Sequence, residues 1–174
     1  MTSLTILGFI FLSFLVFTSY NFFSLGKFGV PSSLSMTAYK FASIKENLKY
    51  LFTATLFLMG FTLVPAWLEI SEWTTYQFMS FLACASILFV GATPNFLDKG
   101  VHVIHSVAAY SSAVFGLTWM FIYSPFWWVF IPVLLLVVTL AILTKTIKSG
   151  LEYWLEMVAF YSIYVSLILQ LIYN

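Results

Sequence analysis

Charged residues are scarce in this chain, and their scarcity limits the class of protein it can be. Only 7% of the 174 residues are Asp, Glu, Lys or Arg, and 62% are hydrophobic. A soluble domain carries roughly 25% charged residues. The chain has too little polar surface to face water on all sides, so lipid has to cover much of it. We expect a polytopic integral membrane protein, located in a bacterial inner (cytoplasmic) membrane.

Arginine is absent, and cysteine occurs once. Without arginine no planar guanidinium is available to bind a phosphate or carboxylate in two places, so lysine has to bind any anion. The net charge of +1 argues against a nucleic-acid partner. A single cysteine excludes an intrachain disulfide. Cys84 lies within an apolar segment, which is typical of a small buried or lipid-facing side chain.

Six apolar runs are each long enough to cross about 30 Å of hydrocarbon. Glycine, proline and charged residues separate most of them, and Pro65 lies near the end of the second run, where a kink is tolerated. The first run lacks a basic leader and a small-residue cleavage site, so we expect a retained span. The sequence predicts an all-α six-helix bundle that forms a single transmembrane domain over 1–174. Its spans lie near 3–23, 49–69, 74–92, 101–123, 126–145 and 151–172.

The lysines predict how these spans are oriented. All seven fall in alternate connections or at their edges: the loop 24–48, the loop after the third span and the loop after the fifth. By the positive-inside rule this face is cytoplasmic, so both termini are external. Five tryptophans fall at the external ends of the spans, where an aromatic belt is expected. They are Trp67, Trp73, Trp119, Trp127 and Trp128.

The loop 24–48 is the only long connection, and its central sequence GVPSSLSMTAYK is rich in hydroxyl groups. Pro31 and the density of Ser and Thr favour an ordered turn or a short interfacial helix. The hydroxyls of Ser32, Ser33, Ser35 and Thr37 suit helix capping, which we favour, or the binding of a polar head group.

Spans four and six each carry a polar stripe. On a helix with 100° per residue, the polar and small residues of span four fall within about 80° of arc. Both helices run outward from the cytoplasm, so their ionisable residues lie at the same depth. A local similarity between HSVAAYS (105–111) and EMVAFYS (156–162) aligns His105 with Glu156. The stripes consist of Asp98, His102, His105, Ala109, Ser112 and Gly116, and of Glu152, Glu156, Ala159, Ser166 and Gln170.

Small residues let helices approach closely, and ionisable residues within a span usually face the bundle interior or a water-filled cavity. We therefore expect His105 and Glu156 to line a polar cavity between spans four and six that opens to the cytoplasm. Asp98 has an alternative role as the N-cap of span four, where an acid suits the helix dipole. The candidate ligand-binding residues are His105, Glu156, His102, Glu152, Asp98, Ser112, Ser166 and Gln170.

We expect no cofactor and no metal. Asp98, His102, His105 and Glu156 are of the ligand types that zinc or iron prefers, but two histidines without a third are a weak metal motif. Two histidines three residues apart on one helix cannot ligate a single haem from both sides, and no mid-span lysine is available for a retinal Schiff base. No phosphate-binding glycine-rich loop is present.

We favour a non-enzymatic membrane protein that binds or moves a small molecule or lipid through this cavity, with membrane lipid as its partner. A metal-dependent intramembrane lipid hydrolase is one alternative, although such enzymes typically have three histidines. A non-catalytic scaffold or regulatory subunit is another. A homo-oligomer and a complex with a partner subunit are both compatible with the sequence.

Two resemblances rest on particular segments. GVPSSLSMTAYK, LVPAWLEISEW, QFMSFLACASILFVGATPNF and VHVIHSVAAY, within residues 29–110, resemble uncharacterised small polytopic membrane proteins of bacteria and phages, which implies no activity. A second pattern resembles the Frag1/DRAM/Sfk1 superfamily, which implies six spans and a role in lipid and membrane homeostasis. This chain departs from the superfamily pattern in two ways. Met36 stands where the pattern has an acid, and the positive-inside rule puts the loop 24–48 in the cytoplasm, whereas the corresponding loop of the superfamily is expected on the opposite side of the membrane. The matching residues are Pro31, Ser33, Ser35, Thr37, His105, Ala108, Ala109, Phe115 and Gly116.

Overall fold

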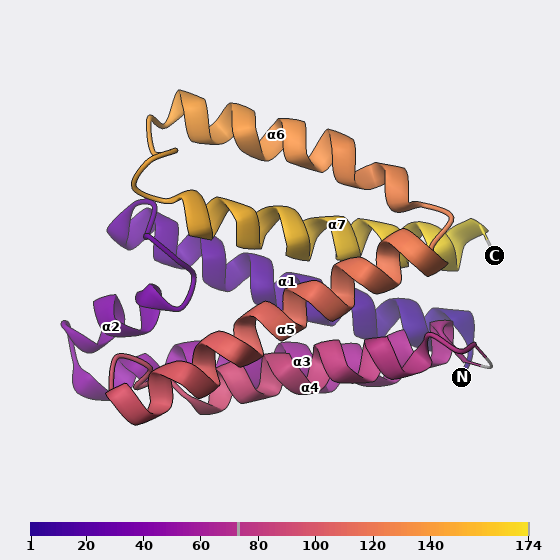
Figure 1. Ribbon diagram of the computed structural model, residues 1–174, viewed down its shortest axis with the longest axis horizontal. Coiled ribbons are helices and arrows are strands. Elements are labelled where there is room, and N and C mark those ends of the chain that lie inside the picture. The colour runs from indigo at the N-terminus through magenta and orange to yellow at the C-terminus, as the bar shows by residue number, and fades with distance from the viewer. Residues whose placement is uncertain (73, 174) are drawn as a thin grey trace.

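The computed structural model describes residues 1–72 and 74–173, and all regular secondary structure in these residues is helical (Figure 1). This confirms the all-α prediction. The elements are α1 (Ser3–Phe28), α2 (Met36–Ala42), the 3-10 helix η1 (Glu46–Lys49), α3 (Tyr50–Ile70), α4 (Gln77–Ala92), α5 (Lys99–Tyr123), the 3-10 helix η2 (Trp127–Val129), α6 (Phe130–Leu143) and α7 (Leu151–Tyr173).

Four helical segments are long and apolar enough to cross a membrane, which indicates an integral membrane protein. They are α1, the continuous segment of η1 and α3, α5 and α7. α4 and the segment formed by η2 and α6 are apolar but shorter. Both lie alongside the four longer helices (Figure 1).

The helix boundaries differ from the predicted ones where glycine and proline were taken as breaks. α1 passes through Gly26 and ends at Phe28, beyond the predicted end at residue 23. The break comes at Gly29, whose φ of 67° suits a residue without a side chain, and whose N–H donates to the Leu25 carbonyl. A turn at residues 124–126 leads into the 3-10 helix η2, so α6 begins at Phe130 rather than at 126. Within the loop 24–48, where an ordered turn or a short interfacial helix was expected, the structure has the short helix α2.

The lysines gather at one end of the molecule. They lie in the last turn of α1, in and after α2, directly before α3, at the first residue of α5 and between α6 and α7. Because successive long helices alternate in direction, these positions all share the end that carries α2, and both termini lie at the opposite end (Figure 1). The prediction that all lysines share one face is confirmed.

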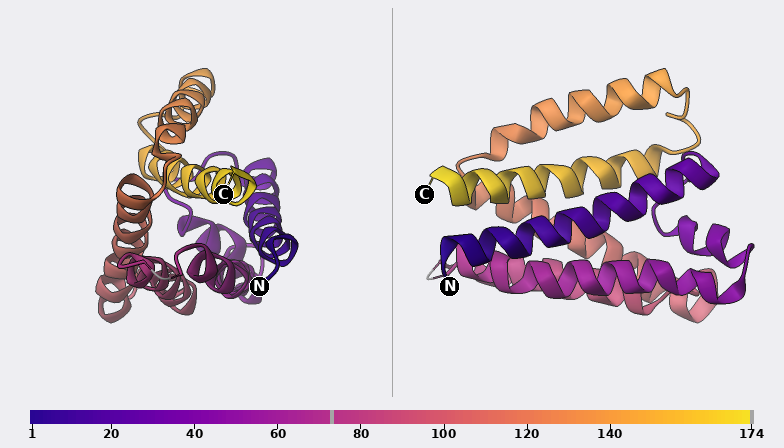
Figure 2. Two further views of the ribbon diagram at one scale, coloured as in Figure 1. Left: turned by 90° about the vertical axis from the view of Figure 1, so that its right-hand side faces the viewer. Right: turned by 180° about the vertical axis from the view of Figure 1, so that it is seen from behind.

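Five helices close into a ring. α1 packs on α3, α3 on α4, α4 on α5, α5 on α7, and α7 returns to α1. α6 is not part of the ring, because it packs chiefly against α7 and η2 on the outside (Figure 2, left). Its splayed position leaves an apolar cleft of about 690 Å³ between α1, α6 and α7.

Two of the predicted belt tryptophans lie in the core instead. Trp67 and Trp119 are 1% and 0% exposed, and their rings meet edge to face with centroids 5.3 Å apart. Trp127 and Trp128 are exposed, as the belt requires, and Trp73 lies outside the described residues. The belt prediction is wrong for the first pair because the large apolar surface of an indole suits a helix contact as well as the membrane interface. The Trp119 N–H has a partner in the Ser71 hydroxyl, whereas the buried Trp67 N–H has none among the described residues.

Buried hydroxyl groups connect the helices of the ring. The Trp119 indole N–H donates to the Ser71 hydroxyl over 2.8 Å, and Ser71 in turn is hydrogen-bonded to Ser80. At another contact, the Ser13 hydroxyl donates to a backbone carbonyl of α3 and lies 2.7 Å from the Tyr164 hydroxyl. Such bonds between helices replace water where lipid surrounds the protein.

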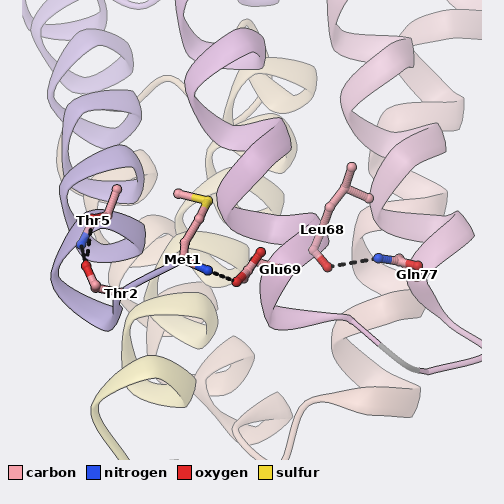
Figure 3. A network of polar contacts seen from close by, with 6 residues as sticks. All are labelled: Met1, Thr2, Thr5, Leu68, Glu69 and Gln77. Atoms are coloured by element: carbon pink, nitrogen blue, oxygen red, sulfur yellow. Dashed lines mark hydrogen bonds and ion pairs between the residues drawn. The ribbon is translucent and has the colours of Figure 1, made fainter.

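Polar contacts also join α1, α3 and α4 at the end that carries the termini (Figure 3). The amino group of Met1 pairs with the Glu69 carboxylate near the end of α3. The Gln77 amide donates to the Leu68 carbonyl over 3.2 Å, which links α4 to α3. The Thr2 hydroxyl accepts the Thr5 backbone N–H and caps α1.

The small-residue stripe of α5 produces a close helix contact, as predicted. A Cβ atom added at Gly116 would lie 2.7 Å from Ile163 Cδ1 of α7 and 3.2 Å from the Trp67 ring of α3. The absence of a side chain at this position therefore lets α5 approach both neighbouring helices.

We expect Gly116→Leu to lower the free energy of unfolding by about 1–3 kcal/mol, because the added side chain overpacks the contact with α7 and α3. Thermal unfolding in detergent micelles, followed by tryptophan fluorescence, measures the change. Gly8→Leu is the matched control, since no atom lies within 4 Å of a Cβ at Gly8. Equal melting temperatures for the two variants would contradict this account of the contact.

Candidate functional site

The chain between α1 and α2 turns inward and lies in the bundle. Pro31, Ser33, Leu34 and Ser35 are all buried. The segment packs closely on the start of α7, where a Cβ atom at Gly150 would lie 2.7 Å from Val30 Cγ1. Because a buried segment outside regular structure carries backbone groups without helix partners, other parts of the chain have to supply those partners.

The first two turns of α7 supply two of them. The Tyr153 backbone N–H donates to the Ser32 carbonyl over 3.1 Å. The Glu156 carboxylate accepts the Leu34 backbone N–H, with 2.6 Å between Oε2 and the nitrogen. The segment is thus aligned along α7 by bonds to its backbone.

α5 holds the next residue of the segment through a histidine. His105 is only 4% exposed, and its Nε2 lies 2.8 Å from the Ser35 hydroxyl. Its Nδ1 lies 2.9 Å from the hydroxyl of Thr93, which follows the last residue of α4. The Phe96 ring stacks on the imidazole with centroids 4.4 Å apart. Two segments, the chain before α2 and the connection between α4 and α5, therefore fix the imidazole in place.

The hydrogen bonds of Thr93 assign the tautomer of His105. The Thr93 Oγ1 atom lies 3.0 Å and 3.1 Å from the carbonyl oxygens of Phe89 and Val90. A carbonyl only accepts, so the single proton of this hydroxyl is directed to the helix backbone. Nδ1 of His105 then carries the proton and donates to Thr93, and Nε2 accepts from the Ser35 hydroxyl.

A polar cavity of about 220 Å³ lies between α5, α7 and the inward segment. It brings His105 and Glu156 together, as predicted, with His102 and Glu152. The last two side chains are exposed, so the cavity reaches the surface at the end that carries the lysines. The remaining lining residues are Ser32, Ser33, Ser35, Met36, Phe96, Ser106, Ala109 and Tyr110.

An apolar cavity of about 60 Å³ adjoins the polar one deeper in the bundle. Ser35, Ala109 and Glu156 line both cavities, so these residues form the boundary between a polar and an apolar environment. Most of the deeper wall is aromatic or aliphatic. It includes Phe52, Leu56, Leu63, Trp67, Ile87, Val90, Phe160, Ile163 and Tyr164.

The other candidate residues lie apart from the polar cavity. Asp98 is exposed at the N-cap position of α5 without a side-chain capping bond. Ser112 lines the apolar cavity, and its hydroxyl donates to the Ala109 carbonyl of its own helix. Ser166 is buried against the Ser124 hydroxyl, and Gln170 is buried further along α7. The stripe on α7 therefore divides between the site and a contact at the other end of the bundle.

The candidate metal ligands are not assembled into a metal site. Across residues 1–72 and 74–173, no three His, Cys, Asp or Glu side chains are placed to hold an ion together. Asp98 is not among the residues that line the cavity containing His102, His105 and Glu156.

Three contacts of the site were not predicted from the sequence: the hydroxyls of Ser35 and Thr93 and the backbone N–H of Leu34. Ser35 stands at the N-cap position of α2, but its side chain makes no capping bond, so the capping interpretation is wrong there. The hydroxyl-rich loop was the available signal for Ser35. The Leu34 contact involves only backbone, which has no signature in the sequence.

Comparisons with known proteins place the chain in no family. No family model, no curated protein and no solved structure matches it. The resemblance to the Frag1/DRAM/Sfk1 superfamily therefore stays a prediction that rests on its residues.

Proposed function

We propose that the chain is a six-span protein of a bacterial inner membrane with its lysine-rich end in the cytoplasm. The seven lysines at one end support this orientation. α4 has 16 residues and the segment Trp127–Leu143 is similarly short. A 16-residue helix extends about 24 Å, and a short span is accommodated by local thinning of the bilayer.

In this orientation the polar cavity opens to the cytoplasm, and we infer that it binds an amphiphilic small molecule or lipid. The observation that carries the inference is that His105 and Glu156 line one cavity together with several hydroxyl groups. Ionisable groups at such positions in a membrane protein commonly mark a ligand or ion path. A polar cavity that continues into an apolar one suits a ligand with a hydrogen-bonding head and a hydrocarbon part.

The topology is tested with reporter fusions in a bacterial host. We expect alkaline phosphatase fused after Tyr173 to be active, because that end of α7 would lie in the periplasm, and green fluorescent protein there to be dark. The same reporters fused after Lys148 serve as the matched pair and should give the reverse pattern, since the α6–α7 connection would lie in the cytoplasm. An active phosphatase after Lys148 overturns the orientation.

Ligand binding is tested by filling the boundary between the two cavities. We expect Ala109→Trp to reduce binding of an ether-linked lysophospholipid at least 10-fold, because an indole at this position occupies the shared wall. Native mass spectrometry of the purified protein measures the bound fraction. Val107→Trp is the control, since Val107 lies on the same helix but is 60% exposed on its outer face.

Undiminished lysophospholipid binding by folded Ala109→Trp would contradict the proposed function, as would a wild-type protein that binds none. A stable co-purifying protein in place of the lipid would instead support the scaffold hypothesis.

A further inference from the structure

The contacts of His105 form a continuous line of three hydrogen-bonding groups. The Ser35 hydroxyl, the imidazole and the Thr93 hydroxyl are joined by distances of 2.8 Å and 2.9 Å. Both lie within the range at which a base removes a proton from a nucleophile and at which a third group orients the base. With Nδ1 protonated and directed at Thr93, the free lone pair of Nε2 faces the Ser35 proton.

We propose that Ser35 is a nucleophile that cleaves carboxylic esters of amphiphiles, with His105 as its general base. The inference rests on the proposed function, because it assigns the substrate class to the same cavity. Thr93 acts as a positioning residue, since it contacts the imidazole and not the substrate. No metal takes part in this arrangement, which differs in this respect from the hydrolase considered from the sequence.

The position of Ser35 supports a reactive rather than a purely structural role. Serine at an N-cap position normally caps its own helix. Ser35 instead directs its hydroxyl to His105 and leaves α2 without a side-chain cap. Although the side chain is mostly buried, it lines both the polar and the apolar cavity. An ester bond lies at the junction of head group and chain, and Ser35 lies at the corresponding boundary.

The chemistry balances with water as the only co-reactant. Ser35 Oγ bonds to the ester carbonyl carbon while its proton moves to Nε2 of His105. The tetrahedral species collapses, the bond from the carbonyl carbon to the alkoxy oxygen breaks, and the leaving alcohol takes the proton from Nε2. Water entering from the polar cavity then attacks the acyl carbonyl and gives its proton to Nε2. Cleavage of the acyl bond returns that proton to Ser35 and releases the carboxylic acid.

A neutral hydroxyl as the orienting group suits the surroundings of the site. If a carboxylate oriented His105 in place of the Thr93 hydroxyl, the site would contain a further charge that has to be desolvated within a membrane protein. Thr93 fixes the tautomer and the ring orientation without a charge, and stacking with Phe96 restrains the ring further. Glu156 acts at a distance from the imidazole, by holding the backbone of the residue before Ser35.

A long-chain alkyl fluorophosphonate tests the inference on the purified full-length protein. In this reaction Ser35 Oγ bonds to phosphorus, fluoride leaves, and His105 accepts the proton. We expect one adduct, mapped to Ser35 by peptide mass spectrometry, and none in Ser35→Ala. His105→Gln should slow labelling about 100-fold or more, the loss typical for removal of a general base. Ser43→Ala is the control, because Ser43 ends the same short helix on its exposed side.

The role of Thr93 has its own readout. Thr93→Val should slow labelling, because the imidazole loses its orienting partner, whereas Thr93→Ser keeps the hydroxyl and should restore the rate. A role in stability alone would leave the labelling rate of the folded valine variant unchanged.

Absence of an adduct at Ser35 in the wild-type protein overturns the inference, and so does rapid labelling of folded His105→Gln. The ether-linked lysophospholipid contains no carboxylic ester, so its binding reports on the cavity alone. If the wild-type protein binds this lipid but is not labelled, the nucleophile is wrong and the proposed function stands.

Discussion

The hydrogen bond from the Leu34 backbone to Glu156 is the interaction on which the arrangement of the site depends. A bilayer offers no water to a polypeptide that leaves regular structure, so each of its polar groups needs a partner within the protein. The first two turns of α7 meet this need with the Glu156 side chain and with the N–H of Tyr153, which has no partner within its own helix. The inward segment is thereby aligned on α7, and its next residue, Ser35, is brought against α5.

The ring of helices explains why these groups meet at one place. α7 packs on both α1 and α5, so the connection that follows α1 starts beside α7 and is directed across the end of the ring. Thr93 reaches the same place because α4 ends there and α5 begins there. Helix ends supply most of the polar partners, since their terminal backbone groups and the residues beside them are free of helix bonds. The deeper wall, formed by helix interiors, is accordingly apolar.

The sequence was sufficient for the helical class, the common end of the lysines and the cavity shared by His105 and Glu156. Each of these follows from the positions of polar residues relative to long apolar runs. It was not sufficient to predict that Trp67 and Trp119 are buried in the core, because the same aromatic ring suits both a membrane interface and a core. The inward segment, which forms part of the wall of the cavity expected between spans four and six, was not predicted, because its anchor at Leu34 is a backbone group. Ser35 has an ordinary local role as an N-cap, which the tertiary contact with His105 replaces.

Gly150 makes the site depend on a position that touches none of its polar groups. Its missing side chain leaves room for Val30 and for the Pro31 carbonyl, which would lie 3.0 Å from a Cβ. The carbonyl is backbone and cannot rotate away, so a larger residue would lift the inward segment from α7 and separate Ser35 from His105. In evolutionary terms, a single codon at the start of the last helix is enough to dismantle the site while every residue that lines it stays the same. Related chains that keep the serine and histidine should therefore be judged first by whether they keep this glycine.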